Sequence, residues 1–492
     1  MKPSLCLATL GMLSFGCCDI AFAAGATTPS PTVEQFVRVR DAHLVLSHVR
    51  VIDGTGKPAV EDQDVYIESG KIARIEAARD LAATKSTTVL DLHGYTVIPG
   101  LVGMHNHLYY IAAPNLEPGR TPIREPPLLL PQMTFSAPRM YLAAGVTTMR
   151  TTGSVEPYAD INLRDQIDAG TLPGPHIDVT APYMEGLNSP FIQMPRLDGV
   201  QQATAFVDYW ASAGATSFKA YMNLPRAELK AAIEAAHRHG RKVTGHLCAV
   251  TYAEAAELGI DDLEHGFFVN TALDAGKAPG VCTDSDGMDT LKSMDPESPA
   301  ADELIRTLVA HHVAVTSTLP VFEAFLLAGR PPLQRRMLDA MSPQARQDYL
   351  YQRNRRFEKP NPDAAVLWAH ALRMERKFVA AGGLLLAGPD PTGNGGVLPG
   401  FGDQREIELL VEAGFAPVEA IRIATFNGAI FEGKERSIGS IEVGKNADLV
   451  VIKGDPSRNI TDIENTEIVF KDGVGYDSAK LFSSIAGRYG QY

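Results

Sequence analysis

The feature that most restricts the fold of this chain is a repeated alternation between short apolar runs and helical patterns. Eight runs of strand length recur through the middle of the sequence, and helical segments separate them. The runs are YTVIPGLVGMHNH (95–107), VTTMRTT (146–152), HIDVTAP (176–182), TSFKAYM (216–222), KVTGHL (242–247), DDLEHG (261–266), VAVTSTL (313–319) and GLLLAGPD (383–390). Such an alternation is typical of parallel strands joined by crossover helices. Eight strands, each followed by a helix, predict an α/β fold of the (β/α)8 TIM-barrel class.

The segments between the runs carry the signals that begin and end helices. The segment PRAELKAAIEAAHRHG has Pro225 at its first helical position and Gly240 at its end, where proline and glycine are favoured. The alternative fold is an open, doubly wound sheet. It is less favoured, because no glycine-rich dinucleotide-binding loop follows the first run.

Strand-rich segments flank this repeating middle at both ends. Residues 43–78 alternate apolar and polar positions around glycine-containing turns, and SIGSIEVGKNADLVVIKGD and TEIVFKDGVG repeat the style near the carboxyl terminus. This pattern is typical of short antiparallel strands. We therefore expect a small β-sandwich domain built from both chain ends, with residues 24–96 and 434–492 as its two parts. Residues 97–433 would form the barrel.

Residues 1–23 have the features of a secretory signal peptide. Lys2 begins the segment, an apolar stretch runs to Phe15, and Ala21-Phe22-Ala23 offers a cleavage site with small residues. The protein is therefore expected to be secreted or periplasmic, and Cys17-Cys18 leaves lipid attachment open as an alternative. No later segment approaches the 18 uncharged apolar residues that a membrane span requires, so none is expected.

Removal of the signal would leave two cysteines, Cys248 and Cys282. Two cysteines cannot form a disulfide framework, so the fold must rest on its core. One bridge is possible in an oxidising compartment, and the sequence leaves open whether the two residues pair.

The charge of the chain excludes one class of partner. The formal net charge is −13, and no basic stretch is available to neutralise phosphates, which argues against a nucleic-acid binder. The hydrophobic fraction of 45% is ordinary for a globular protein with a sizeable core.

Polar residues with metal-binding side chains collect at the ends of the predicted strands. They are His105 and His107 on the first, Lys219 on the fourth, His246 on the fifth, His265 on the sixth and Asp390 on the eighth. The carboxyl ends of barrel strands converge on one mouth. Since residues two apart on a strand face the same side, His105 and His107 should point together and Asn106 away from them. Imidazole and carboxylate are ligands of divalent zinc, manganese or iron, so the sequence predicts a metal site.

Lys219 is the unusual member of this set. It lies inside an apolar strand, SFKAYM, where a lone ammonium group is unfavourable. Desolvation lowers the pKa of a lysine and leaves a reactive neutral amine. Addition of carbon dioxide would convert this amine into a carbamate that can bridge two metal ions.

The motifs PGLVGMHNH, SFKAY, VTGH, LEHG and LAGPD, in this order, resemble those of the metal-dependent amidohydrolase superfamily. The resemblance extends to VIDGTG, AGVTTMR, GTLPGPHI and IGSIEVGKNADLVVIKGDP, and so covers most of the mature chain. Within the superfamily, the chain is most similar to secreted imidazolonepropionase-like and prolidase-like enzymes, which include ochratoxin-cleaving enzymes. It departs from them after Arg150, where relatives commonly carry Asp and this chain has Thr151.

The resemblance implies a binuclear site and a mechanism. His105, His107 and Asp390 would bind the more buried of two divalent metal ions, taken to be Zn2+, and His246 and His265 the more exposed one. Lys219, N-carboxylated, would bridge them. A water between the metals would attack the substrate, and Asp390 would transfer its proton to the leaving amine.

The expected activity is hydrolysis of an amide bond in a small molecule. The first candidates are N-acyl amino acids or dipeptides whose free carboxylate is held by Tyr221 and by Arg226 at the start of the next helix. The alternative within enzymes is a cyclic amide, carbamate or xenobiotic amide without a carboxylate. An alternative of another class is a non-catalytic metal- or ligand-binding protein. A homo-oligomer is also expected.

Overall fold

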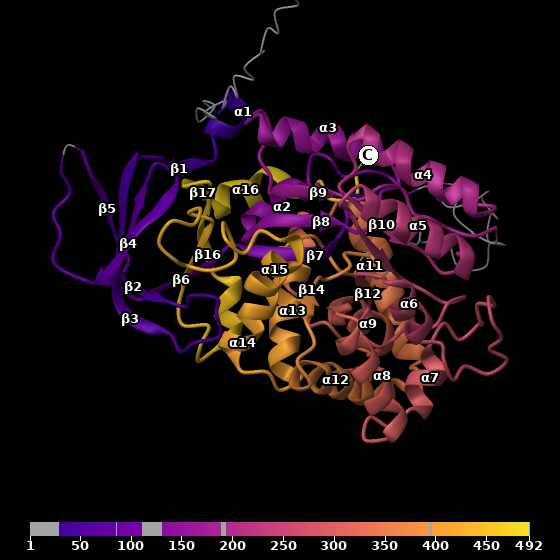
Figure 1. The fold of residues 1–492 in the computed structure, drawn as a ribbon. Helices are drawn as coiled ribbons and strands as arrows, with labels where there is room; N and C mark the ends of the chain where they lie inside the picture. Colours follow the sequence, from indigo (N-terminus) through magenta and orange to yellow (C-terminus); the bar gives the residue numbers. More distant parts are fainter. Residues whose placement is uncertain (1–28, 85, 111–129, 188–192, 393–395, 492) are drawn as a thin grey trace, which may run out of the picture.

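The computed structural model describes residues 29–84, 86–110, 130–187, 193–392 and 396–491 (Figure 1). The predicted signal peptide lies outside these residues, and so does most of the proline-rich connection that follows the first barrel strand.

Eight parallel strands follow one another in sequence order at the centre of the molecule. Three of them form one sheet in the order β7-β8-β9, and five form a second in the order β10-β11-β12-β13-β14. Their bounds are β7 (Leu101–Asn106), β8 (Val146–Thr151), β9 (His176–Val179), β10 (Ser217–Ala220), β11 (Lys242–Gly245), β12 (Asp262–Glu264), β13 (Ala314–Ser317) and β14 (Leu385–Ala387).

The two parallel sheets are joined at both of their free edges. Parallel bridges link Thr180 to Ser217 and Met184 to Ala220, between β9 and β10. At the other edge, the backbone N–H of Asp390, just after β14, donates to the carbonyl oxygen of His105 on β7 at 3.1 Å. This sequential order is that of a TIM barrel-type fold and differs from a doubly wound sheet, whose strand order reverses.

The helices between these strands cover the outside of the sheets (Figure 1). Several begin with proline or with a capping side chain; for example, the hydroxyl of Thr251 accepts from the N–H of Glu254 at the start of α6. Their bounds are α2 (Ala137–Ala143), α3 (Pro157–Asp168), α4 (Val200–Ala213), α5 (Arg226–Arg238), α6 (Tyr252–Leu258), α7 (Met288–Ser293), α8 (Pro299–Ala310), α9 (Leu319–Leu326), α10 (Arg335–Ala340), α11 (Pro343–Glu358), α12 (Ala364–Ala380), α13 (Phe401–Glu412), α14 (Pro417–Arg422) and α15 (Gly428–Glu432).

The predicted first strand, residues 95–107, is two strands rather than one. β6 (Tyr95–Pro99) pairs antiparallel with β15 (Leu449–Lys453), whereas β7 pairs with β8. Gly100 separates them, and a Cβ there would lie 2.1 Å from Oγ1 of Thr147, so only glycine fits at this crossing. The apolar run continues across Gly100 because both strands are buried, which is why the sequence pattern did not divide them.

A nine-stranded sheet combines both ends of the chain. Its order is β1-β17-β16-β15-β6-β2-β3-β4, with β5 paired to β2. In Figure 1 the indigo strands lie beside the yellow ones. The remaining bounds are β1 (Val37–Val39), β2 (His43–Val51), β3 (Val60–Glu68), β4 (Lys71–Ala77), β5 (Thr88–Asp91), β16 (Thr466–Lys471) and β17 (Val474–Asp477). Short helices α1 (Pro31–Glu34) and α16 (Ser478–Ile485) accompany it. The π-helical turn η2 (Ile423–Asn427) precedes α15, and the 3-10 turn η3 (Ile460–Glu464) lies between β15 and β16. The expected sandwich of two facing sheets stays a prediction, as do the domain boundaries.

Two hydrophobic cores support this arrangement. The larger is continuous through the barrel strands and their helices, and a smaller one, including Leu46, Val65 and Phe470, lies against the nine-stranded sheet. Among the residues that the structure describes, none of the helices combines the length and hydrophobicity needed to cross a membrane.

Candidate metal centre

The carboxyl ends of the barrel strands place all six predicted metal ligands around one cavity. The cavity has a volume of about 320 Å³, and His105, His107, Lys219, His246, His265 and Asp390 all line it. Tyr221 lines it as well, together with Tyr109, Tyr183, Asp286 and Phe322. Asn106 points elsewhere, as its alternation on β7 predicted, because its Nδ2 donates to Oδ1 of Asp403 on α13 at 3.1 Å.

Three of these residues form the most compact group of donor atoms. One ligand atom from each of His105, His107 and Asp390 lies within 4.8 Å of the others, and all three residues are buried. Oδ1 of Asp390 lies 3.1 Å from Nε2 of His107 and 3.8 Å from Nε2 of His105. Asp390 adopts a left-handed backbone conformation with φ of 48°, which a non-glycine residue adopts rarely and which is common at functional sites.

The donor set fits a divalent metal ion. Burial lowers the pKa of His105 to about 4 and also lowers that of His107. Both imidazoles are therefore neutral at physiological pH, which is the form that binds metal.

His246 and His265 form a second pair beside the first group. Their rings are 4.5 Å apart, and the ring of His265 is 4.6 Å from that of His105. Nδ1 of His265 lies 2.9 Å from the hydroxyl of Thr318, which fixes the orientation of that ring. The structure thus brings both predicted pairs of histidines to one place.

Lys219 is fully buried in the cavity floor, with 1% of its surface exposed. Burial lowers the pKa of its amine, although the carboxylates of Glu264 and Asp390 oppose this effect. The environment is therefore the one expected for a lysine that reacts with carbon dioxide, and the carbamate itself stays a prediction.

A buried charge network below the cavity was missed from the sequence. Oε2 of Glu264 lies 2.6 Å from Nδ1 of His105, and Oε1 accepts from Nη2 of Arg150 at 3.2 Å. Nη2 of Arg150 also donates to Oδ2 of Asp262 at 2.9 Å. A carboxylate behind a histidine fixes the tautomer that presents Nε2 to a metal. Two acidic residues two positions apart in the buried run DDLEHG were the signal that could have found this network.

The charge state of Glu264 follows from its neighbours. Burial alone would raise the pKa of this carboxyl group, but the surrounding positive charges, led by that of Lys219, outweigh burial and lower it. Glu264 is therefore ionised and able to accept a hydrogen bond from the N–H group at Nδ1 of His105.

Tyr221 and Arg226, which were predicted to hold a substrate carboxylate together, do not line the same cavity. Tyr221 lines the cavity, with its ring 5.0 Å from that of His246. Arg226 begins α5, its side chain is 48% exposed, and its Nη2 lies 3.5 Å from Oε2 of Glu257 on the neighbouring helix α6. It does not line the cavity. The first residue of a helix after the strand can point along the outer surface, and here it does so.

Cys248 and Cys282 form a disulfide with a Cα–Cα distance of 4.7 Å. The bridge joins the segment just after His246 to the long connection between β12 and α7. The sequence left open whether these two cysteines pair, and in the structure they do. Neither sulfur is a nucleophile or a metal ligand in this state.

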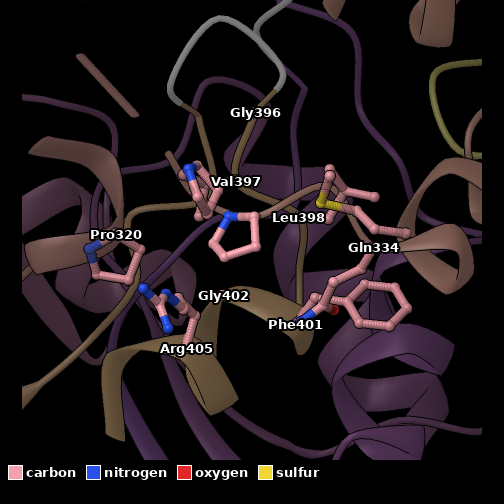
Figure 2. Close-up of a pocket in the computed structure, with 11 residues that line it drawn as sticks. Pro320, Gln334, Gly396, Val397, Leu398, Phe401, Gly402 and Arg405 are labelled. Carbon is pink, nitrogen blue, oxygen red and sulfur yellow. The ribbon is translucent and has the colours of Figure 1, made fainter. Parts of the chain in front are cut away.

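A second hollow of about 30 Å³ lies beside α13 (Figure 2). Its walls are mainly proline and apolar residues, including Pro320 and Phe401. Its charged member, Arg405, is bound by Glu323 at 2.7 Å and by Glu408 at 2.5 Å. Because that charge is already satisfied, we assign no chemistry to this hollow.

A TIM barrel-type fold with imidazole and carboxylate donors at the carboxyl ends of its strands is an arrangement suited to a metal-dependent enzyme. The model of the Amidohydrolase family matches residues 96–328 and 397–475, which is more than half of the chain. The protein belongs to the amidohydrolase family. The resemblance predicted from the sequence motifs is therefore confirmed, and this family supports an enzyme that hydrolyses amide bonds with divalent metal ions.

Solved structures similar to the chain cover nearly all of its length. A Xaa-Pro dipeptidase with bound methionine in the active site has 21% identity and a TM-score of 0.64, over 88% of this chain and 100% of that one. A. niger ochratoxinase has 16% identity and a TM-score of 0.62, over 92% of this chain and 100% of that one. A bottromycin amidohydrolase has 20% identity and a TM-score of 0.65, over 93% of this chain and 94% of that one. The chain spans less than a fifth of the length of the curated relatives that it matches.

Proposed function

We propose that the protein hydrolyses the amide bond of a small substrate, a dipeptide or an N-acyl amino acid, with two divalent metal ions held in the cavity. The observation that carries this proposal is the group formed by His105, His107 and Asp390 within 4.8 Å, beside His246, His265 and Lys219 in the same cavity. Zn2+ is the proposed ion, because neutral imidazole and carboxylate are its usual ligands.

His105, His107 and Asp390 would hold the more buried ion, His246 and His265 the other, and N-carboxylated Lys219 would contact both. When bound, these ions would polarise the scissile carbonyl group and acidify a water molecule. The residues of the chain supply the remaining functions. Glu264 keeps the proton of His105 on Nδ1, at 2.6 Å. Asp390 accepts a proton from the attacking water at its carboxylate and returns it to the leaving nitrogen, which departs as a neutral amine.

The cavity supports a substrate of dipeptide size. Its volume of about 320 Å³ is at the lower end of the range of ligand sites. Val321, Phe322 and Phe325 supply apolar lining, and the phenols of Tyr109, Tyr183 and Tyr221 supply polar groups. Because Arg226 lies outside the cavity, we assign it no part in holding a substrate carboxylate. Cyclic amides, carbamates and other amides without a carboxylate are the second candidate class. The position of Arg226 outside the cavity favours this class, because such substrates need no cation to bind a carboxylate.

The test is a mass-spectrometric screen of zinc-loaded protein against dipeptides, N-acyl amino acids and cyclic amides. We expect release of an amino acid from at least one of the first two classes, and loss of the activity after chelation of the metal. A protein that binds well under one transition metal ion per chain, and whose activity a chelator leaves unchanged, would refute the metal-dependent mechanism. Metal binding without hydrolysis of any class would instead favour the non-catalytic alternative.

Three further expectations stay part of this proposal. We propose that the two parallel sheets close as one barrel, which the bridges at both of their edges support. We propose that the protein is secreted or periplasmic, and the Cys248–Cys282 disulfide supports this because disulfides persist in oxidising compartments. A homo-oligomeric state is the third, and size-exclusion chromatography with light scattering tests it.

A further inference from the structure

The connection between β12 and α7 places a carboxylate, that of Asp286, in the wall of the cavity. Oδ2 of Asp286 lies 3.3 Å from Nε2 of His246. No sequence motif assigns a role to this residue, and the proposed reaction does not use it. Its position beside a predicted metal ligand nevertheless places it next to the reacting atoms.

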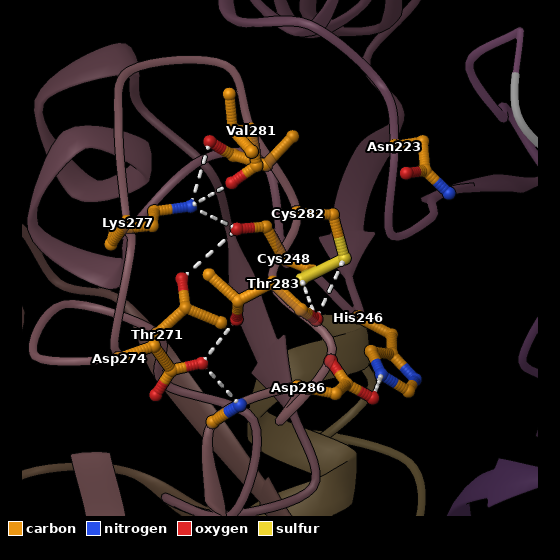
Figure 3. Close-up of a disulfide and its surroundings, with 12 residues drawn as sticks. Asn223, His246, Cys248, Thr271, Asp274, Lys277, Val281, Cys282, Thr283 and Asp286 are labelled. Carbon is orange, nitrogen blue, oxygen red and sulfur yellow. Dashed lines mark hydrogen bonds and ion pairs between the residues drawn. A yellow bond between two sulfur atoms is a disulfide. The ribbon is translucent and has the colours of Figure 1, made fainter. Parts of the chain in front are cut away.

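The connection is firmly held around this residue (Figure 3). Asp274 accepts from the backbone N–H groups of Gly287 at 2.9 Å and Thr290 at 3.0 Å, and from the hydroxyl of Thr283 at 2.5 Å. Asp286 therefore lies between Thr283 and Gly287, which are both bonded to the carboxylate of Asp274.

Two further bonds tie the connection to the end of β11. Nζ of Lys277 donates to the carbonyl oxygens of Cys248 and of Ala249, the latter at 3.0 Å, and to that of Val281 at 2.8 Å. The Cys248–Cys282 disulfide crosses the same gap. A loop so fastened presents its carboxylate in a fixed position, which is the requirement for selective recognition.

The carboxylate of Asp286 is short of partners. Oδ1 is buried and has no hydrogen-bond partner, and within the described ranges His246 is the one cationic or titratable side chain at ion-pair distance from it. The side chain of Asp286 is 31% exposed, although its Oδ1 atom is buried. A ligand in the cavity can therefore approach the rest of the carboxylate.

The surroundings favour a cationic group over a second role in metal binding. No described group of three or more donor residues within 4.8 Å contains Asp286 together with His246 or His265. Its grouping with Cys248 and Cys282 is not a metal site, because the two sulfurs are bonded to each other. Tyr221 lines the same cavity, with its ring 5.0 Å from that of His246, and aromatic rings attract ammonium groups.

We infer that Asp286 binds the protonated α-amino group of the substrate, so that the preferred substrates are dipeptides with a free amino terminus rather than N-acyl amino acids. This inference rests on the proposed amide hydrolysis. In a dipeptide a single Cα separates the ammonium nitrogen from the scissile carbonyl carbon, a distance of about 2.5 Å. The group that binds the ammonium must therefore lie beside the metal ligands, as Asp286 does. An α-amino group is largely protonated at neutral pH.

The experiment compares alanyl-leucine with N-acetyl-alanyl-leucine, by release of leucine from the zinc-loaded protein. The variants are Asp286→Asn, which keeps the shape of the side chain, and Asp284→Asn, an exposed residue two positions away, as the matched control. We expect wild type and the control to hydrolyse alanyl-leucine with a kcat/KM at least about 100-fold above that for the acetylated compound, since a site built for a polar group discriminates strongly against its loss. Asp286→Asn should lower kcat/KM for alanyl-leucine about 10- to 100-fold, mainly through KM, and leave the acetylated substrate unaffected.

Zinc content per chain, measured by mass spectrometry of the same preparations, separates recognition from metal binding. We expect it to be equal in wild type and Asp286→Asn, and a loss of zinc in the variant would overturn the inference in favour of a metal ligand. Equal hydrolysis of both substrates by wild type would overturn the inference alone and leave the proposed function standing. Hydrolysis of neither compound, nor of any other amide in the screen, would overturn the proposed function and this inference with it.

Discussion

The substitution Glu264→Gln tests whether the network below the cavity prepares it for metal. Glu264 is fully buried, its Oε2 lies 2.6 Å from Nδ1 of His105, and its Oε1 accepts from Arg150 at 3.2 Å. The glutamine side chain has the same shape but one acceptor oxygen and no charge. If its oxygen faces His105, its amide group meets the guanidinium of Arg150, and two donors oppose each other.

Two separate losses follow, and their magnitudes differ. Removal of one partner of a buried ion pair should destabilise the metal-free protein by about 3–5 kcal/mol. Here Asp262 remains as a second partner of Arg150 at 2.9 Å, so we expect the lower end of that range. Weaker orientation of His105 should raise the dissociation constant for zinc about 10- to 100-fold, which corresponds to about 1–3 kcal/mol.

Urea unfolding of metal-free protein measures the first quantity, and competition with a chromophoric chelator measures the second. Glu257→Gln is the control, because Glu257 is an exposed carboxylate that lies 3.5 Å from Arg226; it should change neither value by more than about 0.5 kcal/mol. Unchanged zinc affinity in Glu264→Gln would refute the reasoning, even if the stability fell as expected.

Three other predictions follow from the buried groups. Lys219→Ala should lower the metal content by at least one ion per chain, with exposed Lys230→Ala as the control, and a normal metal content would rule out the bridging carbamate. Burial raises the pKa of Glu375 to about 8; the folded state therefore keeps a proton that the unfolded state releases above its own pKa of about 4.3. Stability should fall as pH rises between these values, by a few kcal/mol in total, and Glu375→Gln should flatten this dependence in urea unfolding at pH 5 to 8. Cys282→Ser should cost about 3–4 kcal/mol of stability, because the disulfide closes a loop with a sequence separation of 34; reduced wild type should show the same loss, and identical midpoints of oxidised and reduced protein would contradict it.

The order of the parallel strands, and the gathering of the predicted metal ligands around one cavity, could be predicted because each depends on short-range pattern. Apolar runs of strand length identify β8 to β14, and polar residues at their carboxyl ends identify the histidines and Asp390, since all such ends meet at one mouth. The pattern failed at Gly100, where two buried strands follow each other without a polar residue between them. Local patterns carry no information on which sheet a buried strand joins.

The direction of a side chain after a strand was less predictable. Arg226 and Asp286 both lie in connections on the same end of the barrel, yet the first pairs with Glu257 on the outside and the second faces His246. The difference arises from tertiary bonds, among them the disulfide and the contacts of Asp274 and Lys277, which join residues far apart in sequence. Glu264 was not predicted for another reason. It directly precedes His265 in the run DDLEHG, and the sequence pattern indicates the histidine alone as the functional residue of that strand end.

The crossing of the chain at Gly100 also bears on how the protein is made. β6 obtains its neighbour β15 from residues about 350 positions later, in a register that opposes Pro99 to Leu449. During synthesis from the amino terminus, this apolar strand must wait for nearly the whole barrel to be produced. Until then β6 pairs only with β2, so its other edge stays open directly before the strand that carries His105, and such edges invite pairing with other chains. We therefore expect a shortened chain that ends before β15 to aggregate rather than to accumulate as a folded barrel.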